Sequence, residues 1–258
     1  MGFFVKTFVF VFGAVIGSFL NVCIYRLPRS KSLVRPGSAC PACDRPIRFY
    51  DNIPLISYML LRGRCRDCGA PISIRYVVVE LITAVLFFMC FRRSGLTFEF
   101  FVEIFFVALL IVVTFIDYEF QIIPDILSLG GLVAGMIFSF MRPGFRFLDG
   151  LYGILLGGGL LFVIAYGYQL ITKREGMGGG DIKLLAMIGA FSGFKGVICS
   201  LVGGSVIGTI VGIPLMLIKG QGTKYAVPFG PFLSLSAVIY LFWGSRLEYM
   251  VTEILLKR

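Results

Sequence analysis

Long apolar runs separated by short polar stretches constrain this chain more than any other feature of its sequence. Of its 258 residues, 58% are hydrophobic, against about 45–50% in an ordinary soluble domain. A helix that crosses a membrane needs about 20 mostly apolar residues. The sequence therefore predicts an all-α polytopic membrane protein with about eight transmembrane helices. These are expected at Phe3–Tyr25, Tyr76–Phe91, Phe98–Ile116, Ile126–Met141, Leu148–Ile171, Ile182–Phe191, Val197–Ile218 and Phe229–Trp243.

Two of these spans have alternative interpretations. The run Phe3–Ile24 is longer than the apolar core of a secretory signal peptide and lacks a small-residue cleavage site, so we expect it to be retained. The sixth run, Ile182–Phe191, is followed closely by glycines and either forms a half-helix or merges with the seventh.

One sizeable polar segment, Arg26–Arg75, separates the first two spans. Its ten basic and three acidic side chains contribute +7 to the net charge of +10. Basic loops face the cytoplasm, so we expect this segment and loops 117–125, 172–181 and 219–228 on the cytoplasmic side. The basic residues of the short loops are either simple topology signals or part of a binding patch. The expected domains are a first helix at 1–25, a cytoplasmic segment at 26–75 and a membrane domain at 76–258.

Four cysteines in the polar segment form two C-x2-C pairs, Cys40 with Cys43 and Cys65 with Cys68. This spacing is typical of zinc sites, and four thiolates would complete the tetrahedral coordination of a structural Zn²⁺. Two disulfides or redox-active thiols are the alternatives, but a cytoplasmic location disfavours lasting disulfides. The other cysteines, Cys23, Cys90 and Cys199, lie in apolar runs and are expected to be buried without a specific role.

The chain contains no histidine, which excludes Ser-His and Cys-His hydrolases and histidine-ligated metal sites. Carboxylates inside spans are costly and therefore functional candidates. Glu99 and Glu103 are expected to reach solvent at a helix end. Asp125 follows Pro124 and is expected to cap the fourth span. The remaining carboxylates in or beside spans are Glu80, Asp117, Glu119, Asp149 and Asp181.

Asp117 and Asp181 are expected at the same cytoplasmic end of the bundle. Two facing carboxyl groups that share one proton suffice to hydrolyse a peptide bond, because the ionised group activates water while its protonated partner polarises the carbonyl. Gly178, Gly179 and Gly180 precede Asp181. Glycines accept positive φ and allow a substrate backbone to approach closely. The alternative is that the glycines form a flexible loop and that Asp181 is an ordinary helix N-cap.

Several motifs resemble the bifunctional type IV prepilin peptidases, in this order along the chain: "GSFLNVCIYRLPR" (Gly17–Arg29), the two cysteine pairs, "DNIPLISYMLLRGRC" (Asp51–Cys65), "PISIRYVVVELI" (Pro71–Ile82), "IDYEFQIIPD" (Ile116–Asp125) and "GMGGGDIKL" (Gly176–Leu184). The resemblance implies an inner-membrane aspartyl peptidase of type IV pilus or type II secretion systems. Such enzymes cut the basic leader of prepilins or pseudopilins after a glycine at the cytoplasmic face, and then methylate the new N-terminus with S-adenosylmethionine.

By motif position the resemblance makes Asp117 and Asp181 the catalytic pair, with Asp125, Lys183, Gly178 and Gly180 in support. It places methylation in the N-terminal region, which contains the zinc pairs and Glu80. The alternative for Glu80 is a buried carboxylate paired with an arginine such as Arg75. The expected partners are the prepilin substrate and the lipid bilayer, not nucleic acid, and a homodimer is left open. A carboxylate-based transporter or channel and a non-catalytic assembly factor are the rival interpretations.

Overall fold

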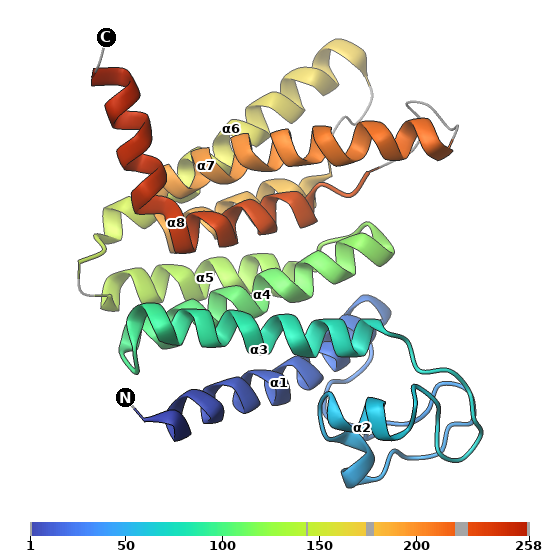
Figure 1. The fold of residues 1–258 in the computed structure, drawn as a ribbon. Coiled ribbons are helices and arrows are strands. Elements are labelled where there is room, and N and C mark those ends of the chain that lie inside the picture. The colour runs from blue at the N-terminus through green and yellow to red at the C-terminus, as the bar shows by residue number, and fades with distance from the viewer. Residues whose placement is uncertain (1, 143, 174–177, 220–226, 257–258) are drawn as a thin grey trace. The chain divides into compact units, whose positions relative to one another are not determined.

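The computed structural model describes residues 2–142, 144–173, 178–219 and 227–256. In these ranges the chain is helical and contains no strand, only two isolated bridges in the polar segment, so the all-α class is confirmed. The helices are α1 (Phe3–Arg26), η1 (Leu27–Arg29), η2 (Phe49–Asn52), α2 (Ile56–Leu60), α3 (Arg75–Ser94), α4 (Phe98–Phe120), α5 (Asp125–Met141), α6 (Phe147–Thr172), α7 (Gly179–Lys219) and α8 (Gly230–Leu256) (Figure 1).

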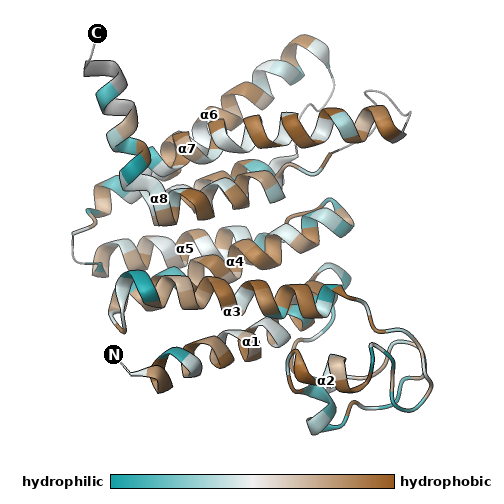
Figure 2. Ribbon diagram, viewed as in Figure 1, coloured by the Kyte–Doolittle hydropathy of each residue, from teal (hydrophilic) through white to brown (hydrophobic). Residues whose placement is uncertain are grey.

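Hydrophobic residues dominate the long helices, and hydrophilic ones gather in the segment between α1 and α3 (Figure 2). By length and composition, four stretches of the described residues could cross a membrane: Phe3–Arg29, Phe98–Phe120, Phe147–Thr172 and Gly179–Ile218. Helix α5 is apolar but shorter. Each of the eight predicted spans is helical, but the number that crosses the membrane stays a prediction.

The chain forms two compact units, residues 1–112 and 113–258. In the first unit, α1 packs closely on α3 through glycines one helical turn apart. A Cβ atom on Gly13 would lie 2.7 Å from the Ala84 Cα, and one on Gly17 would lie 2.7 Å from the Glu80 Cα. Small residues at this spacing let two helix backbones approach in a membrane. The predicted boundary at residue 75 therefore falls inside a unit in which the flanking helices pack together.

In the second unit, α7 is interrupted at Gly193, whose φ of 69° and ψ of −174° are not helical. Glycine adopts this positive φ without the steric cost that a Cβ would bring. The two parts of α7 correspond to the predicted spans Ile182–Phe191 and Val197–Ile218. The first part packs against α6 so closely that a Cβ on Gly153 would overlap the Gly189 carbonyl.

The second part of α7 runs back along α8 (Figure 1). The Ser236 hydroxyl on α8 donates a hydrogen bond to the Cys199 carbonyl at 3.0 Å. Further along, a Cβ on Gly212 would lie 3.7 Å from Val227, which precedes α8. The chain thus changes direction at Gly193, and its second part leads back to the end of the bundle where α7 begins. Helix α8 starts at that end.

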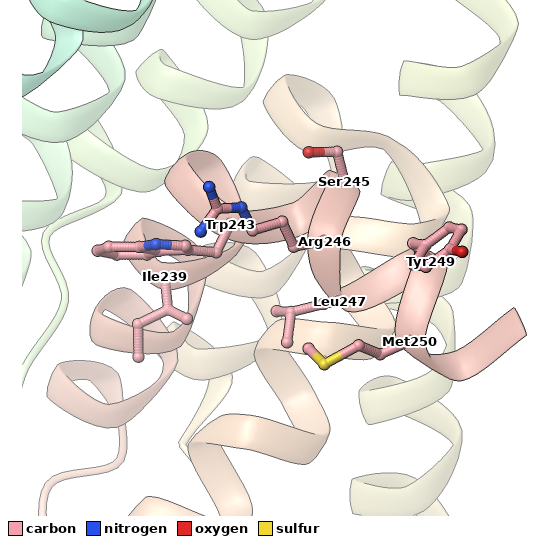
Figure 3. Close-up of a pocket in the computed structure, with 7 residues that line it drawn as sticks. All are labelled: Ile239, Trp243, Ser245, Arg246, Leu247, Tyr249 and Met250. Carbon is pink, nitrogen blue, oxygen red and sulfur yellow. The ribbon is translucent and has the colours of Figure 1, made fainter. Parts of the chain in front are cut away.

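A cavity of about 690 Å³ opens beside the C-terminal half of α8 (Figure 3). Trp243, Arg246 and Tyr249 are among its lining residues. Tryptophan and tyrosine are enriched where membrane meets water. This part of α8 thus has the composition of an interfacial anchor.

We predict that Gly153→Ala destabilises the protein by about 1–3 kcal/mol, because the added methyl group must push apart two helix backbones already in contact. Circular dichroism melts in detergent should show a lower unfolding midpoint. Gly159→Ala is the matched control, since a Cβ there meets no atom within 4 Å. Equal midpoints for the two variants would contradict the prediction.

Candidate active site

Asp117 lies near the C-terminal end of α4 and is buried, with 6% of its surface exposed. Its Oδ2 atom accepts a hydrogen bond of 2.9 Å from the backbone N–H of Gly230, the first residue of α8. A buried carboxylate needs such a donor to offset its lost hydration. The structure therefore places Asp117 where two helix ends meet.

Asp181 is the third residue of α7 and is half-buried. Its backbone N–H donates to the Gly178 carbonyl at 3.2 Å, so Asp181 lies inside the first helical turn and the alternative interpretation as an N-cap is wrong. Its carboxyl group is close enough to Asp117 for the two to repel each other electrostatically. The structure thus brings together the two carboxyl groups that the sequence had paired.

The glycines before Asp181 differ in their surroundings. Cβ atoms on Gly178 and Gly179 would meet nothing within 4 Å, whereas one on Gly180 would lie 3.0 Å from the Cβ of Ile123. Gly179 and Gly180 are helical. Open space for a substrate backbone is therefore found at Gly178 and Gly179, and packing against Ile123 accounts for Gly180. Gly176, Met177 and parts of the loops 172–181 and 219–228 lie outside the described residues.

Asp125 and Lys183 form an ion pair, with 2.6 Å between Oδ1 and Nζ. Asp125 is the first residue of α5, the N-cap position belongs to Pro124, and no side chain caps the helix. The predicted capping role of Asp125 is thus wrong. Its carboxylate instead links the start of α5 to Lys183, two residues after Asp181 in α7.

The sequence patterns did not predict a role for Gly230, because its contribution comes from the backbone and not from a side chain. A Cβ on Gly230 would lie 2.7 Å from Asp117 Oδ2, so a larger residue could not approach the carboxylate in the same way. The available signal was the glycine between Pro228 and Pro231 at the start of the last apolar run.

The four cysteines of the polar segment converge in the first unit. Their Sγ atoms all lie within 4.8 Å of one another, and those of Cys40 and Cys68 are 3.8 Å apart. A zinc ion with bonds of about 2.3 Å to four tetrahedral sulfurs would hold those sulfurs about 3.8 Å apart. The cysteines are free rather than joined in disulfides, so the cluster fits a zinc ion.

Each cysteine pair lies on a turn of the same construction. The Cys40 N–H donates to the Arg45 carbonyl at 3.0 Å, and the Asp44 N–H donates to the Cys40 carbonyl at 2.9 Å. The second turn repeats these bonds at 2.8 and 2.9 Å, with Cys65, Ala70 and Gly69 in the equivalent positions. Backbone N–H donors from Cys68 and Asp67 lower the pKa of the Cys65 thiol to about 7, which favours the thiolate that binds metal.

Glu80 is buried on α3, with 7% of its surface exposed. Its Oε2 atom accepts a hydrogen bond of 2.8 Å from the Leu55 N–H, and the Ser18 hydroxyl also bonds to its carboxylate. Leu55 has a φ of 63°, unusual for a residue other than glycine. Glu80 therefore holds a strained turn of the polar segment against α1 and α3.

Glu103 differs from the expectation that it reaches solvent. It is buried, with 2% of its surface exposed, and it pairs with Arg93 at 3.2 Å and with the Ser94 hydroxyl at 2.8 Å. The basic end of α3 thus neutralises this carboxylate inside the protein. As predicted, Cys23 and Cys90 are buried, whereas Cys199 is partly exposed.

Two protein families match this chain, and the gap between the two matches lies close to the boundary between the two compact units. The bacterial peptidase A24 N-terminal domain matches residues 11–94, which include the cysteine cluster and Glu80. The type IV leader peptidase family matches residues 104–213, which include Asp117 and Asp181. No solved structure matches the chain.

Three relatives share the name prepilin leader peptidase/N-methyltransferase. The Aeromonas hydrophila protein is 36% identical over 93% of this chain and 91% of its own length. The Pseudomonas aeruginosa protein is 34% identical over 91% and 89%. The Myxococcus xanthus protein is 42% identical over 83% of this chain but only 64% of its own length. The chain therefore belongs to the type IV leader peptidase family.

Proposed function

We propose that this protein is an inner-membrane prepilin peptidase that cleaves the basic leader of prepilins or pseudopilins with Asp117 and Asp181, and then methylates the new N-terminus. The observation that carries the peptidase half is the interacting pair of carboxyl groups formed by buried Asp117 and half-buried Asp181. Both lie within the stretch that matches the type IV leader peptidases. The names of the relatives support both halves.

Cleavage needs one ionised and one protonated carboxyl group. The ionised group takes a proton from water, whose oxygen bonds to the scissile carbonyl carbon, while the protonated group gives its proton to the carbonyl oxygen. Collapse of the tetrahedral intermediate breaks the C–N bond as the amine nitrogen accepts a proton. Two close carboxyl groups suit this chemistry because they cannot easily both ionise.

The charge distribution supports cleavage at the cytoplasmic face. The basic excess of Arg26–Arg75 favours a cytoplasmic position for this segment. With eight spans, the end of α4 and the start of α7, which carry the two aspartates, lie on the same side. Exposed Gly178 and Gly179 leave room for an extended substrate backbone beside Asp181.

Methylation is assigned to the first unit. A cavity of about 570 Å³ is formed there by α1 and the polar segment, and Ser18, Ser38 and Asn52 are among its lining residues. This volume lies within the usual range for small-ligand sites, and we propose that S-adenosylmethionine, which would supply the methyl group, binds here. Glu80 bonds to Ser18 and to Leu55, beside the lining residue Pro54. We therefore propose that Glu80 positions the wall of this cavity.

The cysteine cluster is proposed to bind one structural Zn²⁺ through Cys40, Cys43, Cys65 and Cys68. Four sulfur ligands leave no open coordination position for catalysis. The polar segment is short and has little core of its own, so metal binding would supply part of its folding energy.

We expect Asp117→Asn and Asp181→Asn each to abolish leader removal, because an amide can neither take nor give the required proton. Co-expression with a prepilin and gel mobility of the product would measure cleavage. Asp149→Asn is the matched control, since Asp149 lies in the first turn of α6 and has no role in the proposed mechanism. Normal cleavage by both active-site variants would contradict the assignment and favour a transporter or an assembly factor.

Purified protein is expected to contain one zinc per chain, measured by elemental analysis. Cys40→Ser should lose the metal, because three thiolates hold the ion less tightly than four. Cys199→Ser should retain it, since this residue lies on α7, outside the cluster. A metal-free wild-type protein, or equal zinc content in both variants, would show that the cluster is not a zinc site.

If Glu80 positions the cavity wall, Glu80→Ala should reduce N-methylation at least about tenfold, the cost of a lost hydrogen bond to a charged group. Glu80→Gln should keep most of it, because an amide oxygen still accepts the Leu55 N–H. Mass spectrometry of the mature pilin N-terminus measures methylation, and leader cleavage by the same samples serves as the control. Equal loss in both variants would indicate that the negative charge itself is required.

A further inference from the structure

Helix α8 begins at the Asp117 carboxylate. The bond of 2.9 Å from the Gly230 N–H to Oδ2 is buried. A Cβ on residue 230 would lie only 2.7 Å from the same oxygen. Pro231 follows and has no N–H, so the amide of Gly230 is the donor that this turn presents to the carboxylate. Glycine at position 230 is thus required by contact with Asp117.

This contact stabilises the ionised form of Asp117 but not that of Asp181. A backbone N–H donor stabilises an ionised carboxylate, and the positive end of a helix dipole adds to that stabilisation. Asp117 receives both from α8. Among the residues that the structure describes, no donor to the Asp181 carboxyl group is found, and its electrostatic neighbour is the negative Asp117. A proton shared by the pair is therefore more stable on Asp181.

We infer that the Gly230 amide is a positioning group that keeps Asp117 ionised as the general base and leaves Asp181 protonated as the general acid. This inference rests on the proposed function and assigns a role to each member of the pair. Gly230 lies beyond residues 104–213, the stretch matched by the leader peptidase family.

The assignment gives a balanced reaction. Asp117 takes a proton from water as the water oxygen bonds to the carbonyl carbon, and Asp181 gives its proton to the carbonyl oxygen. When the C–N bond breaks, Asp117 returns its proton to the amine nitrogen and the hydroxyl of the intermediate returns one to Asp181. Both groups then have their starting protonation states.

Gly230→Ala tests the positioning role. The methyl group should displace the Asp117 carboxylate from the amide and lower kcat by about 10- to 100-fold, somewhat less than the loss of an oxyanion-hole donor. KM for the prepilin and the unfolding midpoint should change little. Gly204→Ala is the structural control, since its Cβ would meet the backbone of Phe232 and Leu233 in the same turn of α8, at 3.2 Å, and no carboxylate atom is among its three nearest neighbours. It should affect the midpoint more than kcat.

The protonation states can be read without turnover. Infrared spectra of the intact protein should show a protonated-carboxyl band that disappears in Asp181→Asn, because the remaining Asp117 carboxylate keeps the Gly230 N–H donor and stays ionised. Persistence of that band in Asp181→Asn would overturn the assignment. Unchanged kcat in Gly230→Ala, or equal loss in Gly204→Ala, would overturn the positioning role. Cleavage by Asp117→Asn would instead refute the proposed function itself, so the two failures are distinguishable.

Discussion

The hydrogen bond between the Gly230 amide and the Asp117 carboxylate joins segments that are far apart in the sequence, and the candidate active site depends on it. Inside an apolar bundle, donors that can offset the cost of a buried carboxylate are scarce. The free N–H groups at helix starts are the ones that the backbone itself provides. The site accordingly forms where the end of α4 meets the starts of α7 and α8.

The meeting of these helix ends follows from the course of α7. Its reversal at Gly193 sends the chain back along α8, so that Gly230 arrives at the level of Asp181. The apolar runs predicted all the long helices, because hydrophobic length is a local property. They could not show that the sixth and seventh runs form two parts of one interrupted helix, because that depends on a single positive φ value.

The parts of the site that were predicted carry a distinctive side chain. Asp117 and Asp181 stood out as carboxylates in apolar surroundings, and the spacing of the cysteines was a local signal for their cluster. Gly230 acts through its backbone, so the signal in the sequence was limited to a glycine placed between two prolines. The roles of Asp125 and Glu103 were misjudged for another reason. Their partners, Lys183 and Arg93, come from other helices and become visible only when those helices pack.

The hydrogen bonds that close the two cysteine turns all join residues that are close in sequence. Every backbone bond that shapes them joins residues between Ser38 and Ile72, and the helices that flank them, α1 and α3, belong to the same compact unit. During synthesis, N-terminal units generally fold first. The cysteine cluster can therefore close, and offer its site to the proposed zinc ion, while the second half of the chain is still being made. Asp117 receives its amide donor only once α8 has been made, so the site in the second unit is completed later than the cysteine cluster.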